Sequence, residues 1–441
     1  MYRHSLVYIF AFVVLFCGVA ALAQQPGTAA PQSSTAPFDV KAAVDAYLAS
    51  VPADARARSD AYFEGGYWLI LWDFLYGSVV ALILLNTRLS AKMRNLSERL
   101  IRFKPLQTFT YWAEFLFVTF LLTLPMTIYE GFFRERKYNL MNQTFGAWFA
   151  DQGKGFVLNL ILVGILVTVL FGIVRRVPRT WWLWGAMVSI VFLMFTNMIA
   201  PVYIFPLFNK FTKLQDETVR QPILSMARAN GIPATDVWEV DASRQSNRVS
   251  ANVSGFLSTQ RITLNDNLLK RCTLPEIEAV MGHEMGHYVL NHVVKDVLFN
   301  SLVALAFFAF LRWSLEWSLA RWGQKWDIRG VGDTAVLPLV VLLASVFFFV
   351  LTPVSNSWVR MQEFEADIFG LNASGQPDGE AKVDLMLGEY RKLDPKPLEE
   401  MIFFDHSSGR TRITAAMRYK AEHLNQVQPL AIIEPASAVD K

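Results

Sequence analysis

The sequence predicts a predominantly α-helical fold, in which a bundle of six or seven membrane-spanning helices carries a small α+β domain. The chain of 441 residues is 53% hydrophobic, and only 18% of its residues are charged, whereas soluble domains carry about 25%. Its apolar residues gather in long runs, each close to the ~20 residues that cross a bilayer. Two polar regions between and after these runs have the patterns of short strands and helices.

The first apolar run lies within residues 1–23. Arg3 and His4 precede it and Ala21-Leu-Ala23 ends it, a pattern typical of a signal peptide. An uncleaved first membrane helix is the alternative interpretation. Residues 24–65 follow as an N-terminal linker or helical segment, because their first part is rich in Pro, Ser, Thr and Ala.

Further apolar runs are predicted to form four transmembrane helices within residues 66–204 and two within residues 297–355. Their approximate bounds are 66–86, 107–129, 155–174, 181–204, 297–319 and 335–355. Arg312 and Glu316 interrupt the fifth run, which is tolerated where a helix faces protein or a water-filled cavity. We therefore expect a multi-pass protein with membrane lipids as partners, in a bacterial inner membrane or, in a eukaryote, the endoplasmic reticulum.

The two polar regions are predicted to fold together as the α+β domain. Residues 205–296 form its first part, in which Trp238-Glu-Val-Asp241 and Arg261-Ile-Thr-Leu264 have the composition of short strands. Residues 356–425 form its second, mostly helical part, and residues 426–441 form a flexible tail. The net charge of +3 without a basic stripe predicts no binding of nucleic acid, and two cysteines exclude a disulfide framework.

The segment His283-Glu-Met-Gly-His287 predicts a zinc site on a helix. Side chains four positions apart on a helix share one face, so both imidazoles can bind one Zn²⁺ per chain. Glu284 lies one position further, where it reaches a zinc-bound water rather than the ion and can act as general base. Thr273-Leu-Pro-Glu276 predicts the start of this helix, because it combines a capping box with an early proline.

The segment Glu363-Phe-Glu-Ala-Asp367 contains the best candidates for a third zinc ligand. Glu363 and Asp367 share one helix face, whereas Glu365 points elsewhere. One of the two acids can bind the metal while the other accepts the free N–H of a ligand imidazole. Spacing alone leaves a second interpretation open, in which these acids form the solvated end of a helix.

These two segments together resemble the type 1 CAAX prenyl proteases, a family of membrane zinc metallopeptidases that has bacterial relatives. The family likewise has Glu-x-x-Ala-Asp after His-Glu-x-x-His. The similarity covers roughly residues 60–420. It includes further segments, which are Tyr138-Asn-Leu-Met-Asn-Gln143, Phe205-Pro-Leu-Phe-Asn-Lys-Phe-Thr-Lys-Leu214, Ser250-Ala-Asn-Val-Ser-Gly-Phe256 and Arg261-Ile-Thr-Leu-Asn-Asp266.

The resemblance implies a gluzincin-like zinc metallopeptidase domain with four groups of site residues. The metal ligands are His283, His287 and Glu363. The residues that support these ligands are Asp367, Asn356 and Arg360. The catalytic residues are Glu284, His406 and Arg412. The residues that bind the substrate as an added strand are Ser250, Ala251 and Asn252.

Departures from the family pattern concern the substrate rather than the metal. Ser407 and Ser408 follow His406 where the family has prolines, and Ser250 stands where the family has an asparagine. Both differences bear on peptide contacts and on specificity for prenyl groups. His292 resembles a position that is often kept in the family, but its spacing from the zinc motif turns it away from the metal, so it is interpreted as structural.

The predicted function is that of an integral membrane zinc metalloendopeptidase. It hydrolyses membrane-associated or C-terminally prenylated, CAAX-type proteins, with Glu284 as general base for a zinc-activated water. The alternative is a membrane quality-control protease, or a non-catalytic clearance factor, without prenyl specificity. Polar residues on both sides of the zinc motif argue against a protease that cuts inside the bilayer. A transporter would instead have broken helices at mid-membrane. We expect a monomer that binds peptide or protein substrates.

Charged loops predict the side of the membrane on which the zinc helix lies. The loops after the first, third and fifth of the six runs carry the basic residues Arg88, Lys92, Arg94, Arg99, Arg102, Lys104, Arg175, Arg176, Arg179, Arg321, Lys325 and Arg329. The positive-inside rule places these loops in the cytoplasm and the zinc helix on the extracytoplasmic side. The resemblance implies the reverse, since eukaryotic family members act from the cytosolic face. The agreement of three loops favours the extracytoplasmic side.

Overall fold

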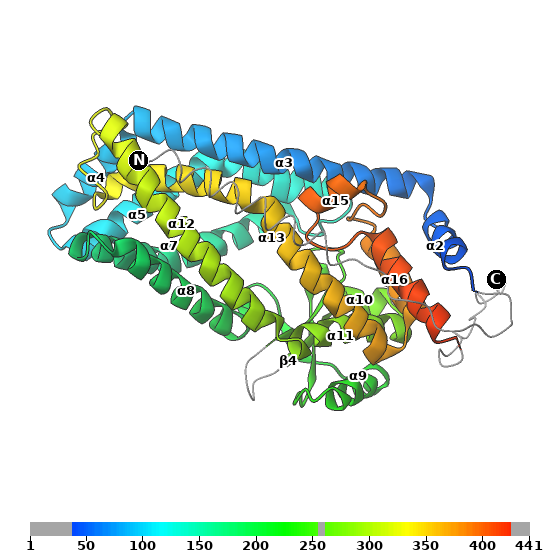
Figure 1. Cartoon of the computed structure of the whole chain (residues 1–441). Coiled ribbons are helices and arrows are strands. Elements are labelled where there is room, and N and C mark those ends of the chain that lie inside the picture. The colour runs from blue at the N-terminus through cyan, green and yellow to red at the C-terminus, as the bar shows by residue number, and fades with distance from the viewer. Residues whose placement is uncertain (1–37, 255–260, 425–441) are drawn as a thin grey trace.

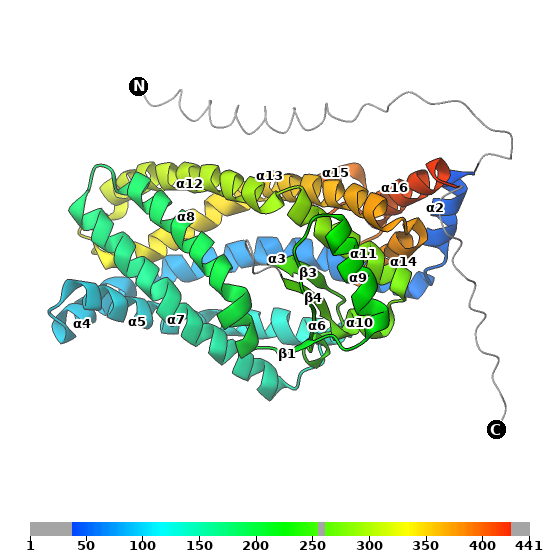
Figure 2. The same cartoon turned by 90° about the horizontal axis from the view of Figure 1, so that it is seen from below.

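The computed structural model describes residues 38–254 and 261–424. Long helices cross the molecule at different inclinations, and the small sheet and most of the shorter helices gather towards one end (Figure 1; Figure 2). The predicted signal peptide or first membrane helix, most of the expected linker before residue 40 and the predicted tail at 426–441 lie outside the described residues.

Within the described ranges, six helices are long and apolar enough to cross a membrane, which confirms the predicted multi-spanning bundle. They are α3 (Ala53–Asn86), α5 (Lys104–Ile128), α7 (Phe145–Arg176), α8 (Trp181–Ile199), α12 (His292–Trp322) and α13 (Leu337–Ser374). The short helix α4 (Leu89–Leu100) connects α3 to α5. Many large apolar side chains on the spanning helices are exposed, as in Val191 and Val350, and in a bilayer such side chains face lipid.

Prolines mark changes of helix geometry near the ends of two spans. Pro125 lies inside α5 just before the π-helical turn η1 (Tyr129–Arg134), and Pro201 lies in the π-helical turn η2 (Ala200–Ile204). A proline has no N–H to donate and its ring crowds the preceding turn, so the regular pattern of helix hydrogen bonds is lost there. A 3₁₀ turn, η3 (Phe205–Leu207), then leads out of the span.

Helix α13 joins the membrane bundle to the polar domain. The predicted boundary between residues 355 and 356 falls inside this helix, which continues to Ser374 although Pro353 lies within it. In Figure 1 the helix bends partway along its length, as expected where a proline interrupts the hydrogen-bond ladder. The acidic segment from Glu363 to Asp367 is thus a direct continuation of a membrane span.

The polar domain contains a four-stranded sheet in the order β1-β2-β4-β3. Its strands are β1 (Phe211–Lys213), β2 (Val237–Val240), β3 (Ala251–Ser254) and β4 (Arg261–Asn265), with β2 and β4 parallel and the other pairs antiparallel. Strands β2 and β4 match the two predicted strands. The surrounding helices are α9 (Glu217–Ala229), α10 (Asp266–Arg271), α11 (Leu274–Val289), α14 (Pro377–Leu387), α15 (Pro397–Phe403) and α16 (Gly409–Glu422).

The segment just before the first span forms a helix that packs against this domain. Helix α2 (Val40–Ala49) buries Val44 and Leu48 in a cluster with residues of α14 and α16. The hydroxyl of Tyr47 donates a hydrogen bond of 2.7 Å to Asp378. Asn142, in the connection between α5 and α7, donates a hydrogen bond of 3.0 Å from its backbone N–H to the carbonyl oxygen of Gln245, in the loop after β2. The membrane bundle and the polar domain therefore share contacts at several points.

Candidate metal centre

The helix that carries the zinc motif begins where the sequence predicts. Thr273 caps α11, and the Glu276 carboxylate accepts a hydrogen bond of 2.6 Å from the backbone N–H of Thr273. Met281 and Met285 on this helix are fully buried in the core that α11 shares with the sheet. The apolar side of α11 thus packs on the sheet, and this leaves the imidazoles on another face.

Glycines allow α11 and α13 to cross in backbone contact. A β-carbon built at Gly282 would lie 2.8 Å from the carbonyl oxygen of Gly370, and one at Gly286 would lie 3.1 Å from the Cα atom of Ala366. Any larger residue at the first position would force the two helices apart. This close approach brings the carboxylates of α13 against the imidazoles of α11.

The structure brings the three predicted ligands together. His283 Nε2 lies 3.1 Å from His287 Nε2 and 3.2 Å from Glu363 Oε2, and His287 Nε2 lies 3.6 Å from Glu363 Oε1. Ligand atoms that surround a tetrahedral zinc at about 2.0–2.1 Å lie about 3.3 Å from one another. Glu363 Oε2 is also buried, and the groups next to it are imidazole nitrogens, Nε2 of His283 and Nε2 of His406, each at 3.2 Å. Two imidazoles and a carboxylate with these spacings fit a zinc ion.

Asp367 contacts the imidazole of His283 on the side away from the other ligands. Its Oδ1 atom lies 2.7 Å from Nδ1 of His283, which leaves Nε2 directed at Glu363. Such a hydrogen bond fixes the tautomer and the orientation of a ligand imidazole. The predicted support of a ligand by Asp367 therefore has the geometry that it requires.

Arg412 lies behind Asp367 rather than in the open part of the site. Its Nε donates to Asp367 Oδ2 at 2.9 Å, its Nη2 donates to Glu380 at 2.9 Å, and its Nη1 lies 2.6 Å from Asp384. Carboxylates therefore contact all three guanidinium nitrogens of Arg412, the residue for which we predicted a catalytic role. Burial raises the pKa of Asp384 well above its ordinary value, although the guanidinium acts in the opposite direction.

A second chain of contacts supports His287 and was missed by the sequence analysis. His287 Nδ1 lies 2.8 Å from His292 Nδ1, His292 Nε2 lies 3.2 Å from Glu365 Oε2, and Lys295 donates to the same oxygen at 2.6 Å. The interpretation of His292 as remote assumed one continuous helix. In the structure α11 ends at Val289, and a left-handed residue, Asn291, with φ of 56° starts a new direction. Asparagine tolerates this conformation. Asn291 was therefore the residue in the sequence that could have indicated the end of the helix before His292.

His406 lies beside the third ligand, in the loop between α15 and α16. Its Nε2 is 3.2 Å from Glu363 Oε2, and its Nδ1 is 2.9 Å from the carboxylate of Asp405. Asn356 and Arg360 contact helix α15 instead of the ligands, contrary to the prediction. Asn356 donates to the carbonyl oxygen of Ile402 at 2.8 Å, and Arg360 donates to that of Glu400 at 2.9 Å. These two hydrogen bonds connect α13 to α15, the helix that precedes the loop of His406.

Glu284 is half-buried and follows His283 on α11. Burial raises the pKa of its carboxyl group, and the neighbouring imidazoles of His283 and His287 act in the opposite direction. Helical geometry turns this side chain away from the line that joins the two imidazoles, beside the ligands rather than among them.

The predicted substrate residues line a cavity of about 460 Å³ beside the sheet. Ser250, Ala251 and Asn252 lie on the wall of this cavity, together with residues of β1 and β4. Strand β3 is an edge strand in the described sheet and packs against α11. The carbonyl oxygen of Ser250 accepts a hydrogen bond of 3.0 Å from the backbone of Asn265, so this residue pairs inwards with β4.

Family comparisons agree with this geometry. Residues 213–420 match the model of peptidase family M48, and residues 41–210 match the model described as "CAAX prenyl protease N-terminal, five membrane helices". An uncharacterized metalloprotease of Bacillus subtilis, YhfN, is 32% identical over 76% of this chain and 79% of its own length. CAAX prenyl protease 1 of Saccharomyces cerevisiae is 28% identical over 67% of this chain and 68% of its own.

The fold is also similar to that of a solved structure. The crystal structure of Ste24p from S. mikatae superposes with a TM-score of 0.72 at 20% identity, covering 92% of this chain and 96% of the other. The matched family models together extend from the first helix of the described chain to its last. The chain is therefore a multi-pass membrane metalloprotease that belongs to the CAAX prenyl protease 1 family, within peptidase family M48.

Proposed function

We propose that this metalloprotease uses one zinc ion per chain to cleave extended segments of membrane-associated proteins, including C-terminally prenylated, CAAX-type proteins. The observation that carries the proposal is the cluster of His283, His287 and Glu363, whose ligand atoms lie within 4.8 Å of one another with Glu284 beside them. A zinc ion held by these residues would polarise the scissile carbonyl group and make the attacking water more acidic.

Glu284 is the proposed general base. It lies next to the ligand His283 but outside the ligand set, which suits a group that takes a proton from the attacking water and passes it to the leaving amine. His406 is the proposed stabiliser of the oxyanion, because its ring is within 3.2 Å of Glu363 and lies in a loop rather than in the packed core. Asp405 orients this ring through Nδ1.

Two chains of contacts position the ligand imidazoles in this proposal. One runs from Arg412 through Asp367 to His283, and the other from Glu365 through His292 to His287. Each ends on the Nδ1 atom, so each leaves the Nε2 atom of its imidazole directed at the metal position. Arg412 is thus a positioning residue, and Asn356 and Arg360 have the same kind of role for the loop of His406.

The substrate binds as an additional strand on β3 in this proposal. In an antiparallel ladder, residues alternate between those that bond the partner strand and those whose N–H and C=O point outwards. The bond from Asn265 to Ser250 puts Ser250 in the first class. Ala251 and Val253 then present their backbone groups to the free edge, where an extended peptide can pair with them. Only segments without stable structure of their own can bind in this way.

The test compares two peptides with the same sequence and a CAAX-type C-terminus, one farnesylated and one not, with the purified protein in detergent micelles. We expect cleavage of the farnesylated peptide, loss of cleavage with a chelator, and recovery when zinc is added. Equal cleavage of both peptides would favour the quality-control protease without prenyl specificity. If neither these peptides nor an unfolded membrane protein is cleaved by the zinc-loaded protein, the non-catalytic clearance factor is the better explanation.

Further proposals concern assembly and orientation. We propose a monomer, because all the proposed catalytic and ligand residues come from one chain. We propose that the metal centre lies on the extracytoplasmic side, as the basic loops predict.

A further inference from the structure

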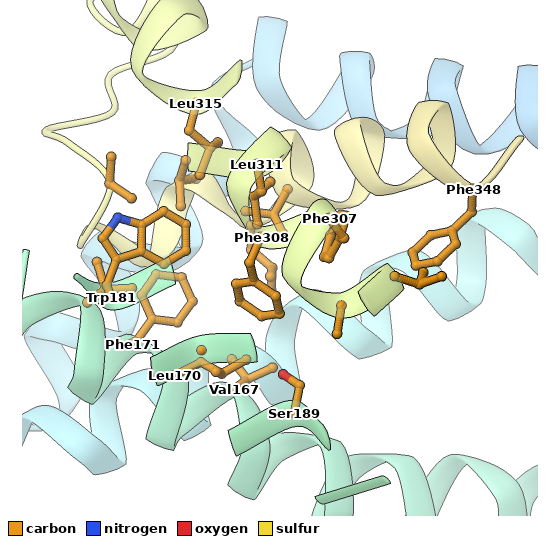
Figure 3. A pocket seen from close by; sticks show the side chains of 18 of the residues that line it. Val167, Leu170, Phe171, Trp181, Ser189, Phe307, Phe308, Leu311, Leu315 and Phe348 are labelled. Atoms are coloured by element: carbon orange, nitrogen blue, oxygen red, sulfur yellow. The ribbon is translucent and has the colours of Figure 1, made fainter. Parts of the chain in front are cut away.

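A large apolar cavity lies among the membrane-spanning helices. Its volume is about 370 Å³, and its walls come from α7, α8, α12 and α13. Figure 3 shows Val167, Phe171, Trp181, Phe308 and Leu311 around it. Along α12 the lining runs from Asn300 to Leu315, a length of about 22 Å at the rise of an α-helix.

The shape and lining of this cavity suit a hydrocarbon chain. Cavities that are lined by apolar side chains offer water few hydrogen-bond partners and take up apolar molecules instead. Ligand pockets in proteins typically have about 300–1,000 Å³. All the helices that line the cavity are membrane spans, so acyl chains of the bilayer are the most abundant apolar molecules next to it. The cavity is therefore long, has few hydrogen-bond donors and acceptors in its lining, and lies among helices that face lipid.

Basic side chains gather at one end of the cavity. Arg312 follows the lining residue Leu311 on α12, and its Nη1 donates a hydrogen bond of 2.8 Å to the carbonyl oxygen of Arg179. Arg176, the last residue of α7, and Arg179, in the loop that follows, are exposed between the lining residues Val174 and Trp181. The acidic residue nearest to them on α12 is Glu316, 3.4 Å from Arg312. This end of the cavity thus has an excess of positive charge.

We propose that the cavity binds an anionic glycerophospholipid, with one acyl chain between α7, α8 and α12 and the phosphate group on Arg312, Arg179 and Arg176. Guanidinium groups bind phosphate oxygens in bidentate geometry. Basic pockets between spanning helices are typical sites for anionic headgroups, particularly in the cytoplasmic leaflet. The loops that carry these arginines are those that the positive-inside rule assigns to the cytoplasm.

A substrate's prenyl chain is a less suitable occupant. From His292, which contacts the proposed ligand His287, to Arg312 the helix α12 rises about 30 Å. The charged end of the cavity is therefore at the opposite end of the span from the metal centre. A lipid that enters from this end places its headgroup against the arginines. A peptide bound at the metal centre lies too far away to contact them. The site is separate from the proposed catalytic reaction.

Native mass spectrometry of the full-length protein, released from micelles that contain dioleoyl-phosphatidylglycerol or dioleoyl-phosphatidylcholine, tests the proposal. We expect one retained phosphatidylglycerol, bound more tightly than phosphatidylcholine. Arg312→Gln and Arg179→Gln should each weaken the binding of phosphatidylglycerol about fivefold, at ~1 kcal/mol per arginine, and leave phosphatidylcholine unaffected. Arg321→Gln is the matched control, since Arg321 is exposed at the same end of α12 but stacks on Trp317.

Filling the cavity tests the position of the acyl chain. Ser189→Trp on α8 and Ala304→Phe on α12 place a larger side chain inside the cavity from two of the helices that line it, and both should abolish retention of either lipid. Met187→Trp is the control, because Met187 is exposed on the same helix outside the lining. Unchanged lipid retention in both filled variants would overturn the proposal. So would equal retention of the two lipids together with their displacement by the farnesylated peptide, which would assign the cavity to a prenyl chain.

Discussion

A β-carbon at Gly370 would lie 2.7 Å from the backbone nitrogen of His283, so the helix of the carboxylate ligand touches the helix of the imidazole ligands backbone to backbone. The positions of the donor atoms depend on this contact, because all three ligands project from these two helices. Because both imidazoles are on α11 and Glu363 is on α13, even a small shift of one helix against the other changes both distances between an imidazole and Glu363.

Gly370→Ala should therefore separate α11 from α13, lower the affinity for zinc and destabilise the protein by about 1–3 kcal/mol, the usual cost of overpacking. Thermal unfolding and metal analysis measure the two effects. Gly146→Ala is the control, since a β-carbon at Gly146 would have no atom within 4 Å, and it should leave both properties unchanged. Full zinc content in Gly370→Ala would show that the close contact is not needed for the site.

Glu284→Gln should retain zinc but lose peptidase activity by a factor of about 10² or more, since the amide cannot accept the proton of the attacking water. Hydrolysis of a fluorogenic peptide and metal analysis of the same sample provide the two measurements. A variant with full zinc and the activity of the parent would rule out the proposed base.

Zinc content should distinguish a ligand from the residues that position ligands. Glu363→Ala removes a donor atom, so we expect it to lose nearly all its zinc at equilibrium with a weak chelator. Asp367→Asn and His292→Phe leave all three donors in place and should weaken zinc binding about 10–100-fold. His292→Asn, which retains an acceptor for the N–H of His287, should recover part of this loss. Equal zinc affinity of His292→Phe and the parent would limit His292 to packing.

Arg412→Met should lower the stability of the folded protein, and any loss of activity should follow from that. The substitution leaves Asp367, Glu380 and Asp384 buried without their cation, and loss of one partner from a buried ion pair costs about 3–5 kcal/mol. His406→Gln, in contrast, should retain stability and lower kcat more than KM. Denaturant unfolding and steady-state kinetics separate the two cases. An Arg412→Met protein with the stability of the parent and a lowered kcat would restore the catalytic role.

Single cysteines should show which side of the membrane carries the metal centre. Ser225→Cys on α9 and Gln324→Cys after α12 are exposed positions in the polar domain and in a basic loop. A membrane-impermeant maleimide on intact spheroplasts should label the first and not the second, in a Cys17→Ser background. Cys272 should not react, because burial raises its pKa to about 12 and little thiolate forms at pH 8. The opposite labelling pattern would place the metal centre in the cytoplasm.

Much of the site could be predicted from the sequence because its chemistry is local. The spacing of His283 and His287 places two imidazoles on one face of any helix, and the capping box of Thr273 makes a helix the expected structure there. The apolar runs identified the spans for a similar reason, since the thickness of a bilayer dictates their length. These properties depend on residues a few positions apart and require no knowledge of the rest of the chain.

The remaining features depend on which helices meet. The contact between Gly282 and Gly370 joins segments from different parts of the chain, and spacing within either segment could not distinguish a ligand at Glu363 from a solvated acid. The turn at Asn291 brings the side chain of His292 to His287. The three carboxylates around Arg412 come from α13 and α14. The sequence by itself therefore determined the membrane class and the donors of the zinc motif. Only the tertiary structure decided that His292 and Arg412 support the site together with Asp367, because a buried polar group takes its partners from whatever element packs against it.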